Sequence, residues 1–476
     1  MDTLPKEFDA IVLGTGLKEG IVSALLSVHG RKVLHIDRND FYGGDCASLK
    51  LSQLYSFFGE SLSSIPAEFG KDNEWSIDLI PKFILSSGDL FYMLRHVDCL
   101  HYLEFGRVAG AFVYNNGVIH RVPATTKQAL DSKLMGLFEK KRMANLFEYI
   151  TSFEENPSAT SNLSSQGKTP ATATCNEYFD AYKLSDSTKE FIGHAMALEL
   201  DDEYLNKPAL ETFRRIDLYT QSLSRFGQSP FIYPLYGLGD LPQAFSRVAA
   251  VWGGIYMLNT PVSEILYNDD KKVRGVRFGD HEVSAPIVVG DPSYFPDLVV
   301  SKGRVGRAIC ILKGPIPECD QQSDVEKDGA GNRIVQTAHQ VILPASQIQR
   351  KSDIYVSTQG YNHRTTPRNC VLGYVSGLVY GSRSDNRDEL KAGFDILKRA
   401  GISKTFYKEY DLLEPKEEAQ RRNIFISKSY DATSHFESTV AESIDMYQRI
   451  TGETLDLTTI VNGQAPTVED RVIVCE

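Results

Sequence analysis

The sequence predicts an α/β protein plus an all-α part: a discontinuous, Rossmann-type domain of the FAD/NAD(P)-binding kind, with a mixed β-sheet and a helical insert. Three patterns indicate this fold. Residues 8–37 read as strand, glycine turn, helix and strand, residues 125–220 repeat apolar side chains at a helical period, and residues 262–289 return to strand periodicity. We therefore expect the α/β domain at 1–122 and 235–476, and the helical domain at 123–234.

The first element is the clearest. Residues 8–13 are a continuous apolar run typical of a buried strand, and Gly14 and Gly16 frame a tight turn. Residues 18–28 then carry apolar side chains on one helical face, and a second strand at 33–36 ends at Asp37. This order opens a dinucleotide-binding domain.

The later elements follow from local patterns. Residues 112–119 predict a β-hairpin, because Asn116-Gly117 suits a type I′ turn. Residues 156–174 are rich in Ser, Thr, Pro and Gly, which predicts an exposed, mobile loop. Residues 191–198 are apolar on most sides and predict a buried helix. Three runs at 262–267, 272–278 and 287–289 predict a β-meander.

Composition narrows the class of protein. A chain of 476 residues with 42% apolar residues can form two or three domains, and a net charge of -11 argues against broad nucleic-acid binding. The start has no signal-peptide core, no run of about 18 apolar residues occurs, and the last four residues are not a CaaX box. The seven scattered cysteines form no CxxC pair or Cys/His cluster. We expect a cytosolic chain without a metal site that is not itself prenylated.

The glycine loop departs from a working nucleotide site. Gly14 and Gly16 stand in the right context, and Asp37 lies 21 residues after Gly16, where an acid would bind a ribose hydroxyl. However, Glu19 occupies the third glycine position of the GxGxxG pattern, and Gly20 comes one residue too late. A carboxylate in the first helical turn competes with a pyrophosphate for the positive helix end.

Two further departures strengthen this interpretation. Asp45 follows Gly43-Gly44, where flavin oxidases of similar layout place an arginine, and residues 425–431 lack a late glycine-acid motif. The loop at Gly14, Gly16, Glu19 and Asp37 is therefore predicted to be vestigial, with no cofactor. Two alternatives stay open: Glu19 points to solvent and flavin still binds, or Glu19 caps its own helix. No catalytic constellation stands out.

Seven segments, taken in order, resemble the Rab GDP dissociation inhibitors, which are relatives of the Rab escort proteins. The segments are residues 11–17, 37–44, 78–83, 134–140, 233–239, 350–356 and 429–436. The resemblance implies a cytosolic, monomeric, non-enzymatic carrier. Such a carrier binds GDP-bound, geranylgeranylated Rab GTPases, slows GDP release, and moves its cargo between cytosol and membranes in vesicle traffic. Two alternatives are a Rab escort protein, which presents Rab to a geranylgeranyl transferase, and a FAD-dependent oxidoreductase.

The resemblance also implies a Rab-binding surface, which maps onto Tyr42, Asp240, Arg247, Ile255 and Met257. Arg247 suits a bidentate bond to a carboxylate of the GTPase. The sequence departs from the family at Asp240, where Glu is usual, and at Ile255, where Thr is usual. The residues alone favour a solvated helix position for Arg247, and the resemblance reverses that interpretation.

Three further regions are implied by the resemblance. The first is a groove for the extended C-terminal tail of the GTPase, at Leu90, Met93, Leu94, Val97 and Leu100. The second is Arg225, in a mobile loop that the family uses at the membrane, although Gln228 stands where Lys is common. The third is a lipid pocket in the helical insert, for which the candidates are Leu134, Leu137, Phe138, Leu146, Phe147, Ile150, Ala195 and Ala197. The alternative for the pocket residues is an ordinary core.

Overall fold

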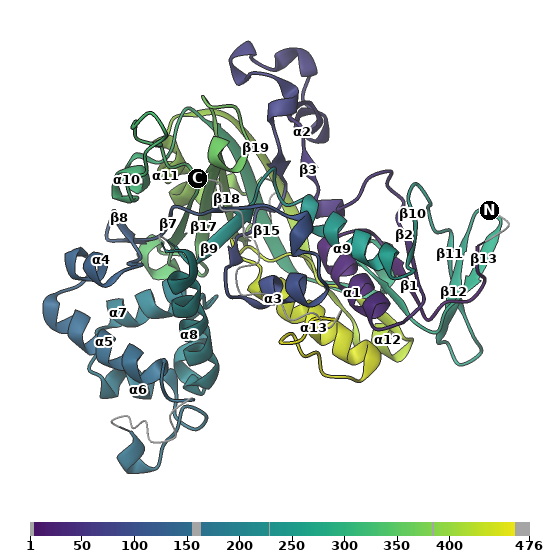
Figure 1. Cartoon of the computed structure of the whole chain (residues 1–476), viewed down its shortest axis with the longest axis horizontal. Helices are drawn as coiled ribbons and strands as arrows, with labels where there is room; N and C mark the ends of the chain where they lie inside the picture. The colour runs from purple at the N-terminus through teal and green to yellow at the C-terminus, as the bar shows by residue number, and fades with distance from the viewer. Residues whose placement is uncertain (1–3, 155–162, 228, 383–384, 462–476) are drawn as a thin grey trace.

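A parallel sheet of five strands forms the centre of the α/β part (Figure 1). The computed structural model describes residues 4–154, 163–227, 229–382 and 385–461. In spatial order the strands are β10 (Ile255–Met257), β2 (Val33–Ile36), β1 (Ala10–Leu13), β14 (Val288–Gly290) and β20 (Ile424–Ile426). Every neighbouring pair is parallel, which confirms the predicted Rossmann-type opening.

Helices cover one face of this sheet and a small sheet covers the other. The helices on the first face are α1 (Leu17–Val28), α3 (Asp89–His96), α9 (Asp240–Val251) and α13 (Glu437–Thr451). Alternation along β1 explains the two layers. Ala10 and Val12 join the core beneath the helices, whereas Ile11 and Leu13 join a second core shared with the small sheet.

The small sheet corrects the predicted meander. It consists of β11 (Glu264–Tyr267), β12 (Val273–Phe278) and β13 (His281–Ser284), all antiparallel. The expected third run, residues 287–289, instead forms β14 and pairs with β1 in the parallel sheet. The prediction failed because β14 is buried on both faces, and such a strand shows no alternation that would tell the two sheets apart.

A seven-stranded mixed sheet forms the second large layer. Its order is β19 (Ile402–Pro415), β15 (Val299–Leu312), β18 (Val371–Val379), β17 (Ile354–Gly360), β16 (His339–Leu343), β7 (Gly110–Asn115) and β8 (Val118–Arg121). β7 and β8 form the predicted hairpin, and Asn116 and Gly117 have φ of 49° and 85°, as a type I′ turn requires. Only the β16–β7 pair is parallel among the pairs that the structure describes here.

The helical part lies beside this sheet, at the lower left of Figure 1. It contains α4 (Thr126–Asp131), α5 (Leu137–Ile150), α6 (Cys175–Ala181), α7 (Asp186–Glu190), a π-helix (Phe191–Met196) and α8 (Ala209–Phe226). The π-helix is buried, as predicted for residues 191–198. In the expected loop at 156–174, residues 156–162 lie outside the described residues, and Leu163 and Ala173 are buried. β9 (Phe231–Pro234) pairs with strands of the α/β part.

Short elements complete the chain. They are β3 (Ser48–Leu49), α2 (Leu51–Phe57), β4 (Ile77–Asp78), β5 (Ile84–Leu85), β6 (Phe105–Arg107), α10 (Pro317–Gln322), α11 (Lys391–Lys398) and α12 (Glu417–Arg421). The six cysteines within the described ranges are buried, unpaired thiols. Among the described helices, none is long and apolar enough to cross a membrane. No group of three or more His, Cys, Asp or Glu that could hold a metal ion occurs in the residues described.

Candidate functional site

The loop between β1 and α1 has the backbone of a nucleotide loop, but its polar groups bond to other protein groups. Gly14 has φ of +90°, and a Cβ atom there would lie 2.7 Å from Asp291 Oδ2. The backbone N–H and the hydroxyl of Thr15 both donate to Asp37 Oδ2, at 2.7 and 2.6 Å. Asp37 Oδ1 accepts from the Asn39 N–H at 2.8 Å. The acid that would bind a ribose hydroxyl is therefore engaged by its own loop.

Glu19 folds back over the loop and fills the space beside Gly16. A Cβ atom at Gly16 would lie 2.5 Å from Glu19 Oε2. The Ser427 hydroxyl donates to Glu19 Oε1 at 2.7 Å, and the residue is only 3% exposed. The alternative in which Glu19 points to solvent is therefore wrong.

Glu19 is largely protonated in the folded protein, whereas the sequence suggests a charged carboxylate. Burial, followed by the nearby Asp291, raises the pKa of Glu19 to about 8. Its carboxyl is thus largely protonated near pH 7, so its bulk, rather than a negative charge, occupies the phosphate position. Hydrogen bonds from Ser427 and from the backbone N–H of Glu19 itself oppose this rise. The N-cap residue of α1, Gly16, has no side-chain cap bond, so the expected capping by Glu19 stays a prediction.

A cavity of about 420 Å³ adjoins the loop. Its lining contains the carboxyl groups of Glu19, Asp37, Asp45, Asp291, Glu409 and Asp411 and the basic groups of Arg38, Arg307 and Lys428. Arg38 stacks on Tyr294 at 4.0 Å, and Arg307 donates to the carbonyl oxygens of Tyr430 and Asp431 at 2.8 and 2.6 Å. Lys428 pairs with Glu414 at 3.3 Å. These residues do not fit the pyrophosphate of FAD, because the acids outnumber the cations and all three cations are already engaged.

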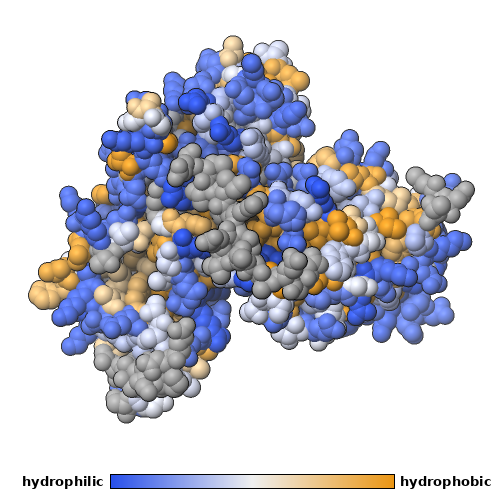
Figure 2. Space-filling model, in the orientation of Figure 1, coloured by the Kyte–Doolittle hydropathy of each residue, from blue (hydrophilic) through white to orange (hydrophobic). Residues whose placement is uncertain are grey.

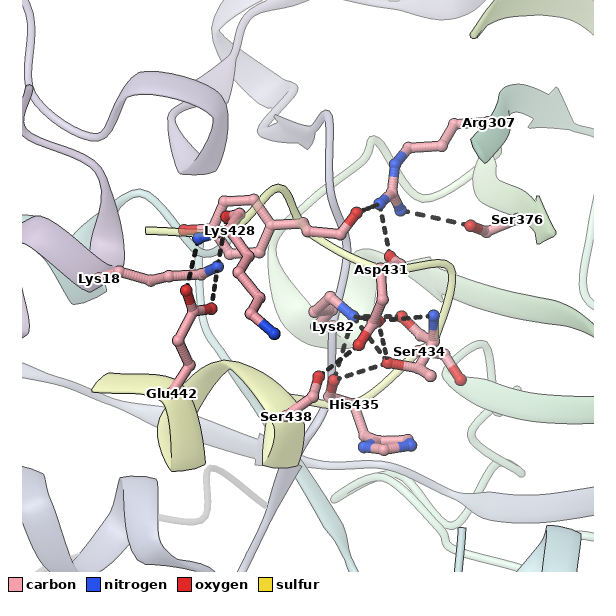
Figure 3. Close-up of polar contacts among 12 residues, drawn as sticks. Lys18, Lys82, Arg307, Ser376, Lys428, Asp431, Ser434, His435, Ser438 and Glu442 are labelled. Carbon is pink, nitrogen blue, oxygen red and sulfur yellow. Dashed lines mark hydrogen bonds and ion pairs between the residues drawn. The ribbon is translucent and has the colours of Figure 1, made fainter. Parts of the chain in front are cut away.

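A buried polar network secures the chain segment behind the cavity (Figure 3). The Lys82 ammonium donates to Asp431 Oδ1 at 2.6 Å, to Thr433 at 2.7 and 2.8 Å, and to the His435 carbonyl at 3.2 Å. Burial lowers the pKa of Lys82 to about 8, although Asp431 opposes this shift. The network holds residues 431–435 against the 78–83 segment, which explains why two of the seven resembling segments meet here.

A second network fixes α1 to α13 in the same view (Figure 3). Lys18, 2% exposed, donates to Glu442 Oε2 and to the Lys428 carbonyl, both at 2.6 Å. Lys18 also lies 4.7 Å from the ring centre of Tyr430. Both lysines therefore serve the packing of the C-terminal segment, so neither is available for a ligand.

An open groove of about 380 Å³ lies on the exposed face of α9. It brings together three of the five residues predicted for partner binding, Tyr42, Asp240 and Arg247. Desolvation raises the pKa of Asp240. The Arg247 guanidinium lies 4.4 Å from the ring centre of Tyr102, so its charge is held in place while the side chain stays exposed.

Sequence reasoning missed several groove residues. Gln243 and Ala250 line the groove with Arg247 and could have been found, since positions 240, 243, 247 and 250 share one helical face. Tyr102 and Tyr256 come from distant segments and carry no such signal. The remaining predicted residues, Ile255 and Met257, lie on β10 and pack against the core on the opposite face of the strand from Tyr256. They do not line this groove.

Stacked aromatic rings connect the groove to the glycine loop. The ring centres of Tyr42 and Tyr256 are 6.0 Å apart, and Tyr256 stacks on His35 at 4.5 Å. His35 Nε2 lies 2.6 Å from the Gly14 carbonyl oxygen, and burial lowers the pKa of His35 to about 4. The neutral ring therefore donates to the loop. Direct contacts through His35 and Tyr256 thus connect the glycine loop to the groove.

The residues predicted to form a tail groove lie on and after α3. Leu90, Met93, Leu94 and Val97 are buried in the large core, and Leu100 is half-buried. The end of α3 is covered by the chain's own C-terminal segment. His96 Nδ1 lies 2.7 Å from the Thr459 carbonyl oxygen, and the Val461 N–H donates to the His96 carbonyl at 3.1 Å.

The structure divides the lipid-pocket candidates into two groups. Leu146, Ile150, Ala195 and Ala197 are buried in the helical layer, and Leu134 and Phe147 pack partly against it. Leu137 and Phe138, by contrast, are 72% and 82% exposed and belong to the outer surface of α5.

Arg225, predicted for a membrane loop, lies at the end of α8. Its guanidinium stacks on Phe91 at 4.0 Å and donates to the Ser86 carbonyl at 2.9 Å. The neighbouring Gln228 lies outside the described residues. In this conformation Arg225 links the helical part to α3.

The fold and the altered loop first define a class: a protein with a FAD/NAD(P)-binding-like fold whose nucleotide loop is filled by its own side chains. The fold is shared with an oxidoreductase from Methanosarcina mazei, which has a TM-score of 0.54 at 15% identity. That match covers 92% of this chain and 99% of the other. At this identity the likeness concerns the fold alone.

The family follows from closer relatives. The model of the family "GDP dissociation inhibitor" matches residues 4–462. A Rab GDP-dissociation inhibitor of Saccharomyces cerevisiae is 43% identical over 461 residues, covering 96% of this chain and 97% of its own length. The solved Rab GDI of Plasmodium falciparum has a TM-score of 0.85 at 38% identity, with 95% and 100% covered. The chain belongs to the GDP dissociation inhibitor family, whose members are regulators rather than enzymes.

Proposed function

We propose that this Rab GDP dissociation inhibitor holds prenylated Rab GTPases in their GDP-bound form, extracts them from membranes and returns them during vesicle traffic. The observation that carries the proposal is the α9 groove, where Arg247 is exposed yet held over Tyr102 beside Asp240. An arginine held in this way is suited to bind a carboxylate on another protein with little loss of side-chain entropy.

Selectivity for the GDP state must come from this groove. The two nucleotide states of a small GTPase differ in their switch regions, so only contacts to those regions can discriminate between the states. In our proposal Arg247 binds a switch-region carboxylate and Asp240 accepts from a donor on the partner. Tyr42 supplies apolar contact at the rim, and Ile255 and Met257 contact the partner around the free edge of β10.

Membrane extraction requires a second contact, to the prenyl group. Burying a prenyl carbon is worth about 0.8 kcal/mol per CH₂, so a geranylgeranyl chain favours a bilayer by roughly 10 kcal/mol. A carrier competes only by adding a lipid pocket to its protein contacts, with the flexible GTPase tail as the linker. We place this pocket in the helical layer, at Leu134, Leu146, Phe147, Ile150, Ala195 and Ala197, and the tail along α3.

The proposal is tested by mixing the purified chain with membranes that carry prenylated Rab loaded with GDP or GTP. We expect equimolar chain to release the GDP-bound Rab into the supernatant and to leave the GTP-bound Rab on the membrane. Rab that stays bound in both states, or leaves equally in both, would contradict the proposal.

A pair of arginine variants then tests the groove. Arg247→Ala should abolish extraction, because nothing else in the groove replaces a bidentate cation. The matched control is Arg421→Ala on α12, whose exposed side chain pairs only with Glu417 among the described contacts. The Arg421→Ala variant should extract as much Rab as the unmodified chain. If both variants lose extraction to the same degree, the assignment of Rab binding to the groove is refuted.

A further inference from the structure

The end of α4 and the start of α5 carry three exposed apolar side chains. Leu130, Leu137 and Phe138 are 62%, 72% and 82% exposed. The Lys140 ammonium donates to the carbonyl oxygens of Leu130 and Ser132, both at 2.6 Å, which ties the start of α5 to the end of α4. The three side chains therefore form one tip. Figure 2 shows hydrophobic surface at the left edge of the molecule, where Figure 1 places the junction of α4 and α5, far from α9 and β10.

Basic side chains surround the tip, although the chain as a whole is acidic. Residues 127–142 contain five basic side chains and two acidic ones, while the whole chain has a net charge of -11. The basic residues are Lys127, Lys133, Lys140, Lys141 and Arg142, and the acidic ones are Asp131 and Glu139. Glu139 is partly neutralised by Arg142 at 3.3 Å. Lys127, Lys133 and Lys141 are exposed.

An exposed Leu-Phe pair with several exposed lysines close by is typical of a segment that anchors a protein at the membrane interface. The apolar side chains enter the boundary between headgroups and acyl chains, and the long lysine side chains reach the headgroup phosphates. We infer that the α4–α5 tip docks on an anionic phospholipid bilayer, with Leu137 and Phe138 inserted and Lys127, Lys133 and Lys141 at the headgroups.

This docking gives the exposed end of α5 a purpose that a pocket role does not. The next turns of the same helix bury Leu146 and Ile150 in the helical layer. A bilayer at the tip thus lies at the start of the helix whose later turns contribute Leu146 and Ile150 to the proposed lipid pocket. Only the link between the tip and the lipid pocket rests on the proposed function. The contact with the bilayer itself requires no Rab.

The test uses the full chain without Rab and measures its flotation with vesicles. We expect binding to vesicles of phosphatidylcholine and phosphatidylserine, weakened by salt, and little binding to phosphatidylcholine alone. Leu137→Ser combined with Phe138→Ser should weaken binding about tenfold or more, since both inserted side chains are lost. Lys133→Glu combined with Lys141→Glu should remove the preference for phosphatidylserine.

The matched control is Val325→Ser, which alters an apolar residue of similar exposure, 65%, that stands between two acids, Asp324 and Glu326. Its binding should be unchanged. Equal binding to both vesicle types, or unchanged binding of the Leu137/Phe138 variant, would overturn the inference. A dimer in sedimentation analysis that the same variant dissociates would also overturn it, in favour of a second copy of the chain. A chain that extracts Rab but ignores bare vesicles would refute this inference alone.

Discussion

The guanidinium of Arg247 lies 4.4 Å from the ring centre of Tyr102, although α9 and the segment after α3 are far apart in the sequence. The ring holds an exposed cation in one place without neutralising it. Such pre-organisation favours binding because less side-chain freedom is lost on contact with a partner. Tyr102 is thus a positioning residue for the groove.

We therefore expect Tyr102→Leu to weaken Rab binding about two- to fivefold, the value of an exposed cation–π contact. Tyr102→Phe keeps the ring and should bind like the unmodified chain. Titration of GDP-loaded Rab measures both. In an Arg247→Ala background Tyr102→Leu should add nothing, and a full additional loss there would show that Tyr102 acts independently of Arg247.

Glu19 makes the free energy of unfolding depend on pH. Its carboxyl ionises near pH 4.5 in an unfolded chain and near pH 8 in the folded protein. Between these values the folded state holds a proton that the unfolded state has released. Stability from this group therefore falls as pH rises, by about 1.4 kcal/mol per pH unit. Glu19→Gln should remove this component, and denaturant unfolding across the window measures it. Parallel stability curves for the two proteins would contradict the assignment.

Lys82 should be essential for stability rather than for binding. Lys82→Ala leaves the half-buried Asp431 without its cation and the buried carbonyl oxygens of Thr433 and His435 without a donor, so we expect a loss of about 3–5 kcal/mol in denaturant unfolding. Lys391→Ala is the matched control, because its i,i+4 pair with Asp395 is exposed and should cost less than about 0.5 kcal/mol. Similar losses for both variants would contradict the role of the buried network.

The C-terminal segment should compete with a GTPase tail for α3. Leu455, Leu457 and Val461 pack on the large core, and Thr459 and Val461 bond to His96. A chain truncated after Gly452 should therefore bind a hydrophobic Rab tail peptide more tightly, while its affinity for the unprenylated GTPase domain stays the same. Fluorescence titration with the two ligands separates these effects. Unchanged peptide affinity would show that the tail does not use this face.

Added FAD should not bind. The Glu19 side chain fills the space beside Gly16, and Asp37 is bonded to Thr15 and Asn39. We expect protein incubated with FAD and then desalted to show no absorbance at about 450 nm from bound flavin. Glu19→Gly should not restore binding, because Asp37 stays engaged. A stoichiometric yellow complex of the unmodified chain would contradict this.

Much of the fold follows from local sequence patterns. The β1–α1–β2 unit, the hairpin at Asn116-Gly117 and the helical insert each depend on periodicity or turn chemistry within a few residues, and each is confirmed. The β-meander was predicted correctly for its first two runs only. The third run became β14 of the parallel sheet, and its short apolar sequence would suit either sheet. Which strands pair depends on how both faces of the sheet pack against other elements. The sequence of one short strand does not contain that information.

The printed sequence is enough to show that a dinucleotide-binding frame carries an altered loop, because Glu19 stands where a glycine is required. How Glu19 acts depends on the folded chain around it. Burial beside Asp291 keeps its carboxyl protonated, so it blocks the loop by volume. The structure likewise brought Tyr102 to Arg247 and separated the exposed Leu137 and Phe138 from the buried Leu146 and Ile150. Burial and charge state depend on segments distant in the chain, and no local pattern contains them.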